Sequence, residues 1–446
     1  MLKRIAVAVL LAAWFLGHTW PGLLRDFSED DLMNMYFAWV LPLPRLLLGN
    51  LTPFTSVYRP LGSAFYRVMY DAAGLHPFPF RVAAYALMLL NIWLVYRLVA
   101  ALTGSAKTGV LSALIFSYHK LLYGIYVNGG TIYDVLCGTF FCLTLWLYVV
   151  TRERRGNVTG WPMLGFLGLY TLALNSKEMA ASIPVILLAY ELIFRKGALG
   201  WKWILERHAI WIAVAMTAVS YKLKTATASS FHGVQTYDRV FTLERYLSTM
   251  TPLISQLFWL RDHALGPAAA MAILAGMFAL ALAMRNRVMM LGAAILVLAA
   301  LPINFIEYRG FFVMYIPLIG FALYASAGLM AAAGRRVPYA AVFMMAVAAL
   351  FLVDRWNHMW NFGIPDVNQL RIEAMRGDLT HFAVPKGGRV LLLRQAFDPG
   401  NYDALFVFRL RYRDPEIAVD IAKASGKYDL VLDYGDGHYF AVHEPE

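Results

Sequence analysis

The chain has 446 residues, of which 60% are hydrophobic and only 15% are charged, and its formal net charge is +11. Soluble domains carry about a quarter charged residues, so this composition excludes an ordinary soluble protein. It predicts a polytopic α-helical membrane protein instead.

Eleven apolar segments are interpreted as membrane-crossing helices, for which about 17 to 25 residues are needed, although several are short. The first follows Met1-Leu-Lys-Arg4 and lacks a small-x-small cleavage site, so we expect a permanent span and not a removed signal peptide. Cys137 and Cys142 both fall in the fourth segment and are expected to be packing residues. The segments are 5–23, 80–102, 109–127, 131–151, 161–175, 179–194, 208–222, 268–284, 288–304, 311–332 and 338–353.

The orientation follows from the distribution of Lys and Arg. With a cytoplasmic N-terminus, the inner connections hold fourteen basic residues and two acidic ones, Glu153 and Glu206. The rest of the chain is then almost neutral, so the basic excess is a positive-inside signal and no nucleic-acid partner is expected. The basic residues are Lys3, Arg4, Lys107, Arg152, Arg154, Arg155, Arg195, Lys196, Lys202, Arg207, Arg285, Arg287, Arg335 and Arg336.

The composition changes after the last segment, where charged residues become frequent. We therefore predict a transmembrane domain, 1–353, with outer loops 24–79 and 222–267, and a small extracytoplasmic α/β domain, 354–446. In the first loop, residues 61–73 are expected to form a helix along the surface. In the small domain, strands are expected at 389–394, 428–433 and 439–442, and helices at 369–382 and 415–425.

Four carboxylates lie within six residues directly after the first segment: Asp26, Glu29, Asp30 and Asp31. Carboxylates crowded at a membrane surface repel one another, so they indicate a cation, a basic partner or a role as a base. For any one of them, an interfacial or structural charge is the simpler interpretation. Further polar residues lie at the outer ends of other segments, namely Arg59, Asp134, Asn175, Lys177, Glu178, Asp262, His263, Glu307, Tyr308 and Arg309.

Carboxylates can take a proton from an acceptor hydroxyl, while Lys and Arg can bind a phosphate that leaves. This combination favours transfer from a phosphate-activated donor. The acids are followed by Tyr58-Arg-Pro-Leu61, Gly74-Leu-His-Pro-Phe78, the segment 90–96, Ser176-Lys-Glu178, and Arg309 with Tyr315-Ile-Pro317. Over residues 20–330, this order resembles the membrane glycosyltransferases of the GT-C superfamily, which use polyprenyl-phosphate sugars and include protein mannosyltransferase-like enzymes.

The resemblance implies a lipid-linked donor that enters from the membrane, inverting sugar transfer at the outer face, and an acid of the first loop as the base. By position the base is Asp30 or Asp31. Glu29, Asp30 and Asp31 also permit a divalent cation, Mg or Mn, without requiring one. Lys177, Arg309 and Arg59 would neutralise the donor phosphate, and Glu178, Asp134 and Tyr308 are expected to be orienting residues, with Glu178 orienting Lys177.

The expected setting is the inner membrane of a bacterium, and the acceptor is left open between a glycan, a lipid and a protein. Two other functions fit a chain with many spans. A transporter or flippase of lipid-linked glycans would place charges near the bilayer midplane and use broken helices or repeats, whereas these charges gather at one face. A polymer ligase or polymerase would rely on basic and His residues in a large late loop, whereas here acids follow the first span.

Overall fold

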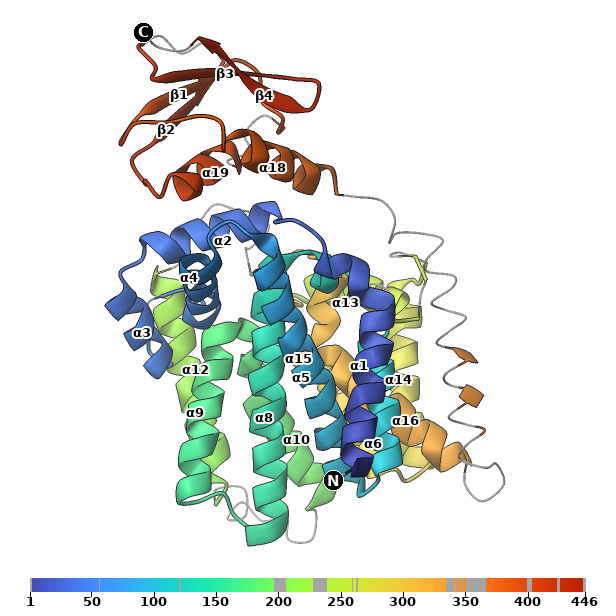
Figure 1. Ribbon diagram of the computed structural model, residues 1–446. Helices are drawn as coiled ribbons and strands as arrows, with labels where there is room; N and C mark the ends of the chain where they lie inside the picture. The colour runs from blue at the N-terminus through green and yellow to red at the C-terminus, as the bar shows by residue number, and fades with distance from the viewer. Residues whose placement is uncertain are drawn as a thin grey trace.

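Figure 1 shows the computed structural model of the chain, in which a bundle of helices lies below a small unit that contains a sheet. Three single helical segments among the described residues are long and apolar enough to cross a membrane: Ile5–Leu23, Pro77–Thr103 and Gly129–Arg155. Other apolar helices are shorter, so the count of eleven spans stays a prediction. The structure describes residues 2–55, 57–119, 122–195, 206–227, 239–258, 260–261, 264–333, 341, 344–345, 348–349, 366–398, 403–422 and 426–443.

Ten of the predicted segments overlap helices of the bundle, and the eleventh, 338–353, lies mostly outside the described residues. Gly292 and Gly320 allow two of these helices to approach closely, because a Cβ on either glycine would lie within 2.7 Å of a backbone atom of the other helix. The helices are α1 (Leu2–Leu23), α5 (Pro77–Thr103), α6 (Ala106–Ser117), α8 (Ile132–Arg155), α9 (Trp161–Ser176), α10 (Ile183–Phe194), α12 (His208–Thr227), α14 (Pro267–Ala283), α15 (Arg287–Ala300) and α16 (Pro317–Ala333).

The predicted segment 109–127 is interrupted. Helix α6 ends at Ser117, and the short helix α7 (Tyr123–Val127) follows. The carbonyl of Ser117 lies 3.2 Å from the side chains of both His18 and Tyr126. Side chains thus replace the backbone amide that would have continued the helix.

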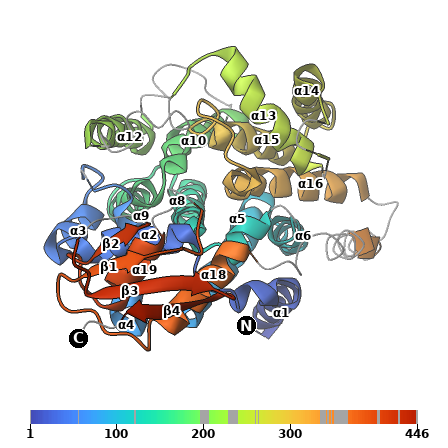
Figure 2. The same cartoon turned by 90° about the horizontal axis from the view of Figure 1, so that it is seen from above.

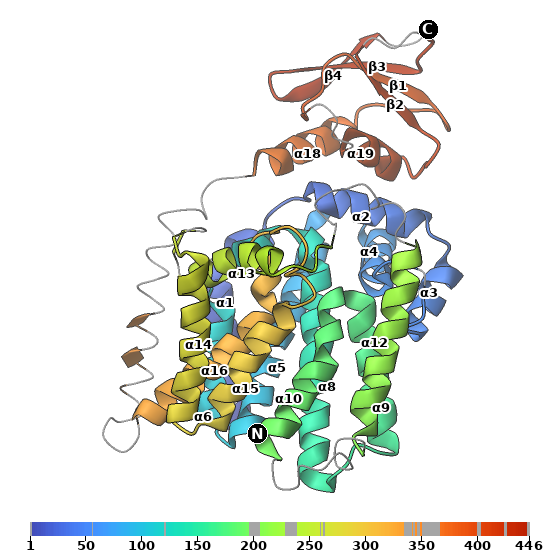
Figure 3. The same ribbon diagram turned by 180° about the vertical axis from the view of Figure 1, so that it is seen from behind.

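The first outer loop is mainly helical. It contains α2 (Glu29–Val40), α3 (Leu43–Leu51) and α4 (Pro60–Ala73), and α4 confirms the helix expected at 61–73. Helix α2 lies across one end of the bundle, with α4 below it (Figures 1 and 3). The same end holds the 3-10 turns η2 (Gly129–Thr131), η3 (Glu178–Ser182) and η7 (Phe311–Tyr315), together with helix α13 (Leu243–Leu257).

The C-terminal unit has a four-stranded sheet in the order β2-β1-β3-β4, with the first three strands parallel and β4 antiparallel to β3. Strands β1 (Arg389–Leu392), β3 (Leu430–Gly435) and β4 (His438–His443) and helix α18 (Val367–Asp378) confirm the predicted elements. The helix predicted at 415–425 is wrong, because strand β2 (Ala418–Ile421) lies there, and the helix α19 (Asp403–Arg411) precedes it. Residues 418–421 pair along β1, and two of them, Val419 and Ile421, are β-branched residues of the kind favoured in strands.

The C-terminal unit rests on the first outer loop. Viewed from above, it covers α2 and α4 (Figure 2), and in the side views α18 and α19 lie directly above α2. Arg376 of α18 forms an ion pair of 2.5 Å with the buried Asp26. Arg409 donates to the Tyr36 hydroxyl at 2.9 Å, and Tyr70 donates to the Leu410 carbonyl at 2.5 Å. Asp26, expected to be interfacial, is therefore an anchor for this unit.

Candidate functional site

Asp31 lies in the first turn of α2, and both oxygens of its carboxylate accept hydrogen bonds from neighbouring groups. Ser28 caps the helix, and Asp31 Oδ2 accepts a hydrogen bond from the Ser28 amide at 2.9 Å. Oδ1 accepts one from the Tyr66 hydroxyl at 2.8 Å, and Arg81 Nη2 lies 3.6 Å from Oδ2. The side chain is buried. This reciprocal cap fixes the start of α2, because it satisfies amides that have no partner within the helix.

Asp30, the preceding residue, has different surroundings. It is exposed, its side chain is hydrogen-bonded by Asn128, and Arg309 and Arg59 act on it electrostatically. Partial desolvation by the surrounding atoms, followed by the negative charge of Asp31, raises the pKa of Asp30 above its ordinary value. An accessible carboxylate with a raised pKa is a stronger base than an ordinary aspartate.

Glu29 begins the same helix but contacts the C-terminal unit. Its carboxylate accepts a hydrogen bond from the Asn368 side chain of α18. The three adjacent acids thus have three different surroundings: Glu29 contacts α18, Asp30 is exposed, and Asp31 is enclosed beneath the helix.

Two glycines bring the start of α8 against these acids. A Cβ on Gly129 would lie 2.1 Å from Asp31 Oδ1, and one on Gly130 would lie 2.3 Å from Asp30 Cβ. Asn128 Oδ1 accepts from the Gly130 amide at 2.8 Å and lies 2.7 Å from Ser28 Oγ. Our sequence analysis missed this contact, although Asn-Gly-Gly before a predicted span is a recognisable turn signal.

Asp134, in the first turn of α8, forms a buried ion pair with Lys177. Lys177 Nζ lies 2.6 and 2.7 Å from the two carboxylate oxygens, and the side chains are 6% and 3% exposed. The ammonium also lies 5.5 Å from the centre of the Phe312 ring, which brings η7 to the same place. Asp134 therefore orients Lys177.

Arg59 and Glu178 form a second pair nearer the surface. Arg59 Nη2 lies 2.7 Å from both Glu178 oxygens, and the side chains are 18% and 40% exposed. The guanidinium lies over the rings of Tyr58 and Tyr133 at 4.7 and 5.3 Å from their centres. Burial opposes ionisation of Glu178, but the charges of Arg59 and Lys177 outweigh it and lower its pKa to about 2.

The partners differ from those expected. Glu178 was expected to orient Lys177, but its hydrogen bonds are to Arg59, and Asp134 holds Lys177. Tyr308 donates to Gln256 of α13 at 2.6 Å. Arg309, the next residue, interacts electrostatically with Asp30. Asp262 and His263 lie outside the described residues.

A metal site has little support in this arrangement. Within the described part of the chain, no group of three or more His, Cys, Asp or Glu side chains could hold a metal ion. Two acids of the cluster are also engaged elsewhere, Asp31 with Tyr66 and Glu29 with Asn368. A divalent cation on Glu29, Asp30 and Asp31 stays an untested prediction.

Comparisons with known proteins concern both the sequence and the fold. Residues 57–222 match the family described as dolichyl-phosphate-mannose-protein mannosyltransferase. No curated protein matches the chain. The crystal structure of ArnT from Cupriavidus metallidurans bound to undecaprenyl phosphate is similar, with 15% identity and a TM-score of 0.54, over 95% of this chain and 86% of that chain. The cryo-EM structure of the arabinofuranosyltransferase AftD from Mycobacteria has 16% identity and a TM-score of 0.46, over 94% of this chain and 32% of that chain.

The family match and the likeness to ArnT agree with each other. The family match runs from Val57, just before α4, to Lys222 within α12, and it includes Arg59, Asp134, Lys177 and Glu178. The fold shared with ArnT extends over nearly the whole chain. Together they confirm the predicted resemblance to GT-C glycosyltransferases and the class of the protein as a membrane enzyme that transfers sugars.

Proposed function

We propose that this glycosyltransferase takes a sugar from a polyprenyl-phosphate donor at the outer face of a bacterial inner membrane and transfers it, with inversion, to an acceptor hydroxyl. The ArnT structure of the same fold holds undecaprenyl phosphate, a polyprenyl phosphate. The matching family is described by dolichyl-phosphate-mannose, again a sugar on a lipid phosphate. Both descriptions support a lipid-linked donor for this chain.

The base in our proposal is Asp30. The acceptor oxygen forms a bond to the anomeric carbon while the bond from that carbon to the phosphate oxygen breaks, the acceptor proton passes to Asp30, and the polyprenyl phosphate leaves. The observation that carries this assignment is the contrast between neighbouring carboxylates. Asp30 is exposed and its pKa is raised, whereas both oxygens of Asp31 already accept hydrogen bonds in a buried position.

The proposed role of Asp31 is to position Asp30. It fixes the first turn of α2 through Ser28 and Tyr66, and it lies against Gly129. Glu29 has a similar task toward the C-terminal unit through Asn368. Neither residue is required to exchange a proton with the acceptor.

Arg59, Arg309 and Lys177 are the proposed ligands or stabilisers of the donor phosphate. Arg59 and Arg309 both act electrostatically on Asp30, so a phosphate between them would lie beside the base. Arg59 is partly exposed and its planar guanidinium suits two oxygens of one phosphate. Lys177 is buried and held in one position by its ion pair with Asp134, and in our proposal its positive charge stabilises the phosphate without direct contact.

The reaction is tested by mass spectrometry of envelope glycans and lipids from cells with and without this protein. We expect one glycan, glycolipid or glycoprotein to lose a sugar when the protein is absent, and the mass difference identifies that sugar. Identical profiles under conditions where the protein is abundant in the membrane would contradict the proposal.

The donor is tested by binding of undecaprenyl phosphate to the purified protein in detergent. We expect the lipid to raise the thermal unfolding midpoint of the wild type, because a ligand that binds the folded state stabilises it. Arg309→Gln should weaken this effect, while Arg287→Gln, an exposed arginine at the start of α15, should leave it unchanged. Equal stabilisation of all three proteins would argue against a phosphate site at Arg309.

A further inference from the structure

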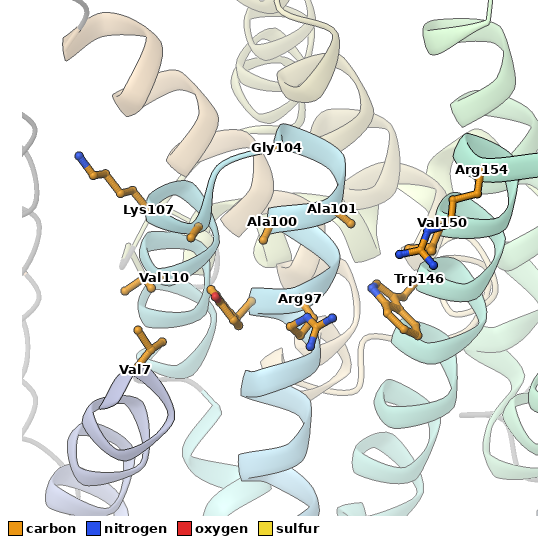
Figure 4. A pocket seen from close by; sticks show the side chains of 12 residues that line it. Val7, Arg97, Ala100, Ala101, Gly104, Lys107, Val110, Trp146, Val150 and Arg154 are labelled. Carbon is orange, nitrogen blue, oxygen red and sulfur yellow. The ribbon is translucent and has the colours of Figure 1, made fainter. Parts of the chain in front are cut away.

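A cavity lies at the opposite end of the bundle from the acids. It has a volume of about 620 Å³ and is lined by residues of helices α1, α5, α6 and α8 (Figure 4). Helix α8 passes both places, with Asp134 in its first turn and Arg154 in its last turn. Twenty residues of helix span about 30 Å, which is the thickness of the hydrocarbon core of a bilayer. The cavity therefore belongs to the other leaflet.

The lining of this cavity is mainly apolar, but it includes three cations. Val110, Trp146 and Val150 belong to the walls, and Arg97, Lys107 and Arg154 are the charged residues. Within the described part of the chain, none of the lining residues is acidic. In Figure 4, Arg97 and Arg154 lie on either side of Trp146, and Lys107 lies at the opposite rim.

Of the charged residues that line the cavity, Arg97 lies farthest from the end of its helix. It lies six residues before the end of α5, about 9 Å along the helix axis, and is half-buried. Its guanidinium lies 5.6 Å from the centre of the Trp146 ring and 6.0 Å from that of Trp93. A cation below the membrane surface is costly unless it is paired or reaches polar groups.

Among the described residues, no carboxylate forms an ion pair with Arg97 or Arg154, and Glu153, beside Arg154 in the chain, pairs with Arg195 at 2.5 Å. The start of α6, at Ala106 and Lys107, also borders the cavity. The positive end of its helix dipole adds to the attraction for an anion.

We propose that this cavity binds an anionic phospholipid from the leaflet opposite the acidic site. Its phosphate lies between Arg97 and Arg154, and an acyl chain follows the apolar wall of Val110, Trp146 and Val150. A general positive-inside signal accounts for cations at the membrane surface, but it does not account for a cavity that combines a half-buried arginine with an apolar wall. The proposal does not depend on the sugar chemistry at the other end.

The test uses the full-length protein in nanodiscs of phosphatidylcholine with a minority of phosphatidylglycerol, followed by native mass spectrometry of the lipids that remain bound. We expect phosphatidylglycerol to be retained preferentially by the wild type. Each arginine near a membrane surface contributes about 1 kcal/mol toward an anionic lipid, so Arg97→Gln and Arg154→Gln should each reduce retention about fivefold. The matched control Arg155→Gln changes an exposed arginine that does not line the cavity and should retain the lipid.

A second variant keeps both charges and removes the space. Ala101 lines the cavity and is exposed, so Ala101→Trp should fill it without disturbing the packed side of α5. Loss of phosphatidylglycerol in Ala101→Trp supports a built site even if an arginine variant fails to fold. The proposal is overturned if Ala101→Trp and the arginine variants retain the lipid like the wild type, if Arg155→Gln loses it equally, or if phosphatidylcholine is retained as well as phosphatidylglycerol.

Discussion

The two ends of helix α8 both hold a buried ion pair with an exposed acid nearby, but the surroundings of that acid differ. At the end near Arg152, Glu191 is 0% exposed and accepts hydrogen bonds from Tyr148 at 2.8 Å and from Arg152 at 2.5 and 2.7 Å. At the other end, the buried pair of Asp134 and Lys177 lies in a network that reaches the exposed Asp30 through Arg59. The exposed Glu153 at the first end pairs with Arg195, whereas the exposed Asp30 at the other end has a raised pKa. Buried ion pairs alone therefore do not identify a reactive site in this protein, and our proposal rests on the exposure and the raised pKa of Asp30.

The largest expected loss of stability concerns the buried ion pair of Glu191 and Arg152. Glu191→Gln should lower the free energy of unfolding by about 3 to 5 kcal/mol, because it leaves Arg152 buried without a counter-charge. Thermal unfolding in detergent measures this, and sugar transfer per folded molecule should stay normal. Glu153→Gln is the control, because it breaks the more exposed pair with Arg195 and should cost less than about 1 kcal/mol. If Glu191→Gln lowers stability no more than the control does, the ion pair and hydrogen bonds of Glu191 do not stabilise the fold.

Variants of the buried pair of Asp134 and Lys177 can distinguish an effect on stability from an effect on sugar transfer. Each single change, Asp134→Leu or Lys177→Met, should cost about 3 kcal/mol, because the remaining charge is buried and unpaired. The double variant should regain most of that stability, yet transfer should stay low, since the charge behind the donor phosphate is gone. A double variant with wild-type stability and wild-type transfer would show that this pair, like Glu191, is purely structural.

A smaller effect is expected where α8 meets α2. Gly129→Ala places a methyl group against Asp31 Oδ1, and such overpacking costs about 1 to 3 kcal/mol. We also expect transfer to fall, because α2 must shift and carries Asp30. Gly124→Ala is the matched control, since its new Cβ would lie 3.7 Å from Phe312, an ordinary contact. Equal stability and transfer in both variants would exclude a close fit at Gly129.

The smallest effect concerns pH. The raised pKa of Asp30 means that the carboxylate is protonated, and lost as a base, at a higher pH than an ordinary aspartate. Transfer should therefore fall on acidification, and Arg309→Gln should move this fall to higher pH, because Arg309 lowers the pKa of Asp30. The pH profile of kcat/KM measures the shift, with Arg287→Gln as the control. A profile that stays in place, or moves to lower pH, would contradict the electrostatic link.

The apolar segments and the outer polar residues could be predicted because each depends on local composition. The segments of residues 5–23 and 80–102 are long and apolar, and they form α1 and α5. The order of polar residues along the chain was also sufficient to suggest which ones share an end of the bundle. Contacts of Asp134, Lys177, Arg59 and Glu178 confirm that these four residues lie together.

The division of roles among the acids could not be predicted, because it depends on contacts between distant segments. Ser28 and Asp31 have the spacing of a helix cap, which was a local signal for a structural Asp31, but the Tyr66 contact joins residues 35 apart. The hydrogen bond from Tyr308 to Gln256 also joins distant segments of the chain, so the sequence alone does not predict it. A helix was wrongly predicted at 415–425, because pairing with strand β1 decides the structure of this short segment and the local sequence does not show that pairing.

The most direct test of the central claim compares sugar transfer by Asp30→Asn and Asp31→Asn, each normalised to folded protein in the membrane. We expect Asp30→Asn to keep the thermal midpoint of the wild type and to lose transfer by about 10² to 10⁴-fold, the usual contribution of a general base. Asp31→Asn should instead lower the midpoint and leave measurable transfer in the molecules that fold. Full transfer by Asp30→Asn would contradict the assignment of Asp30 as the base.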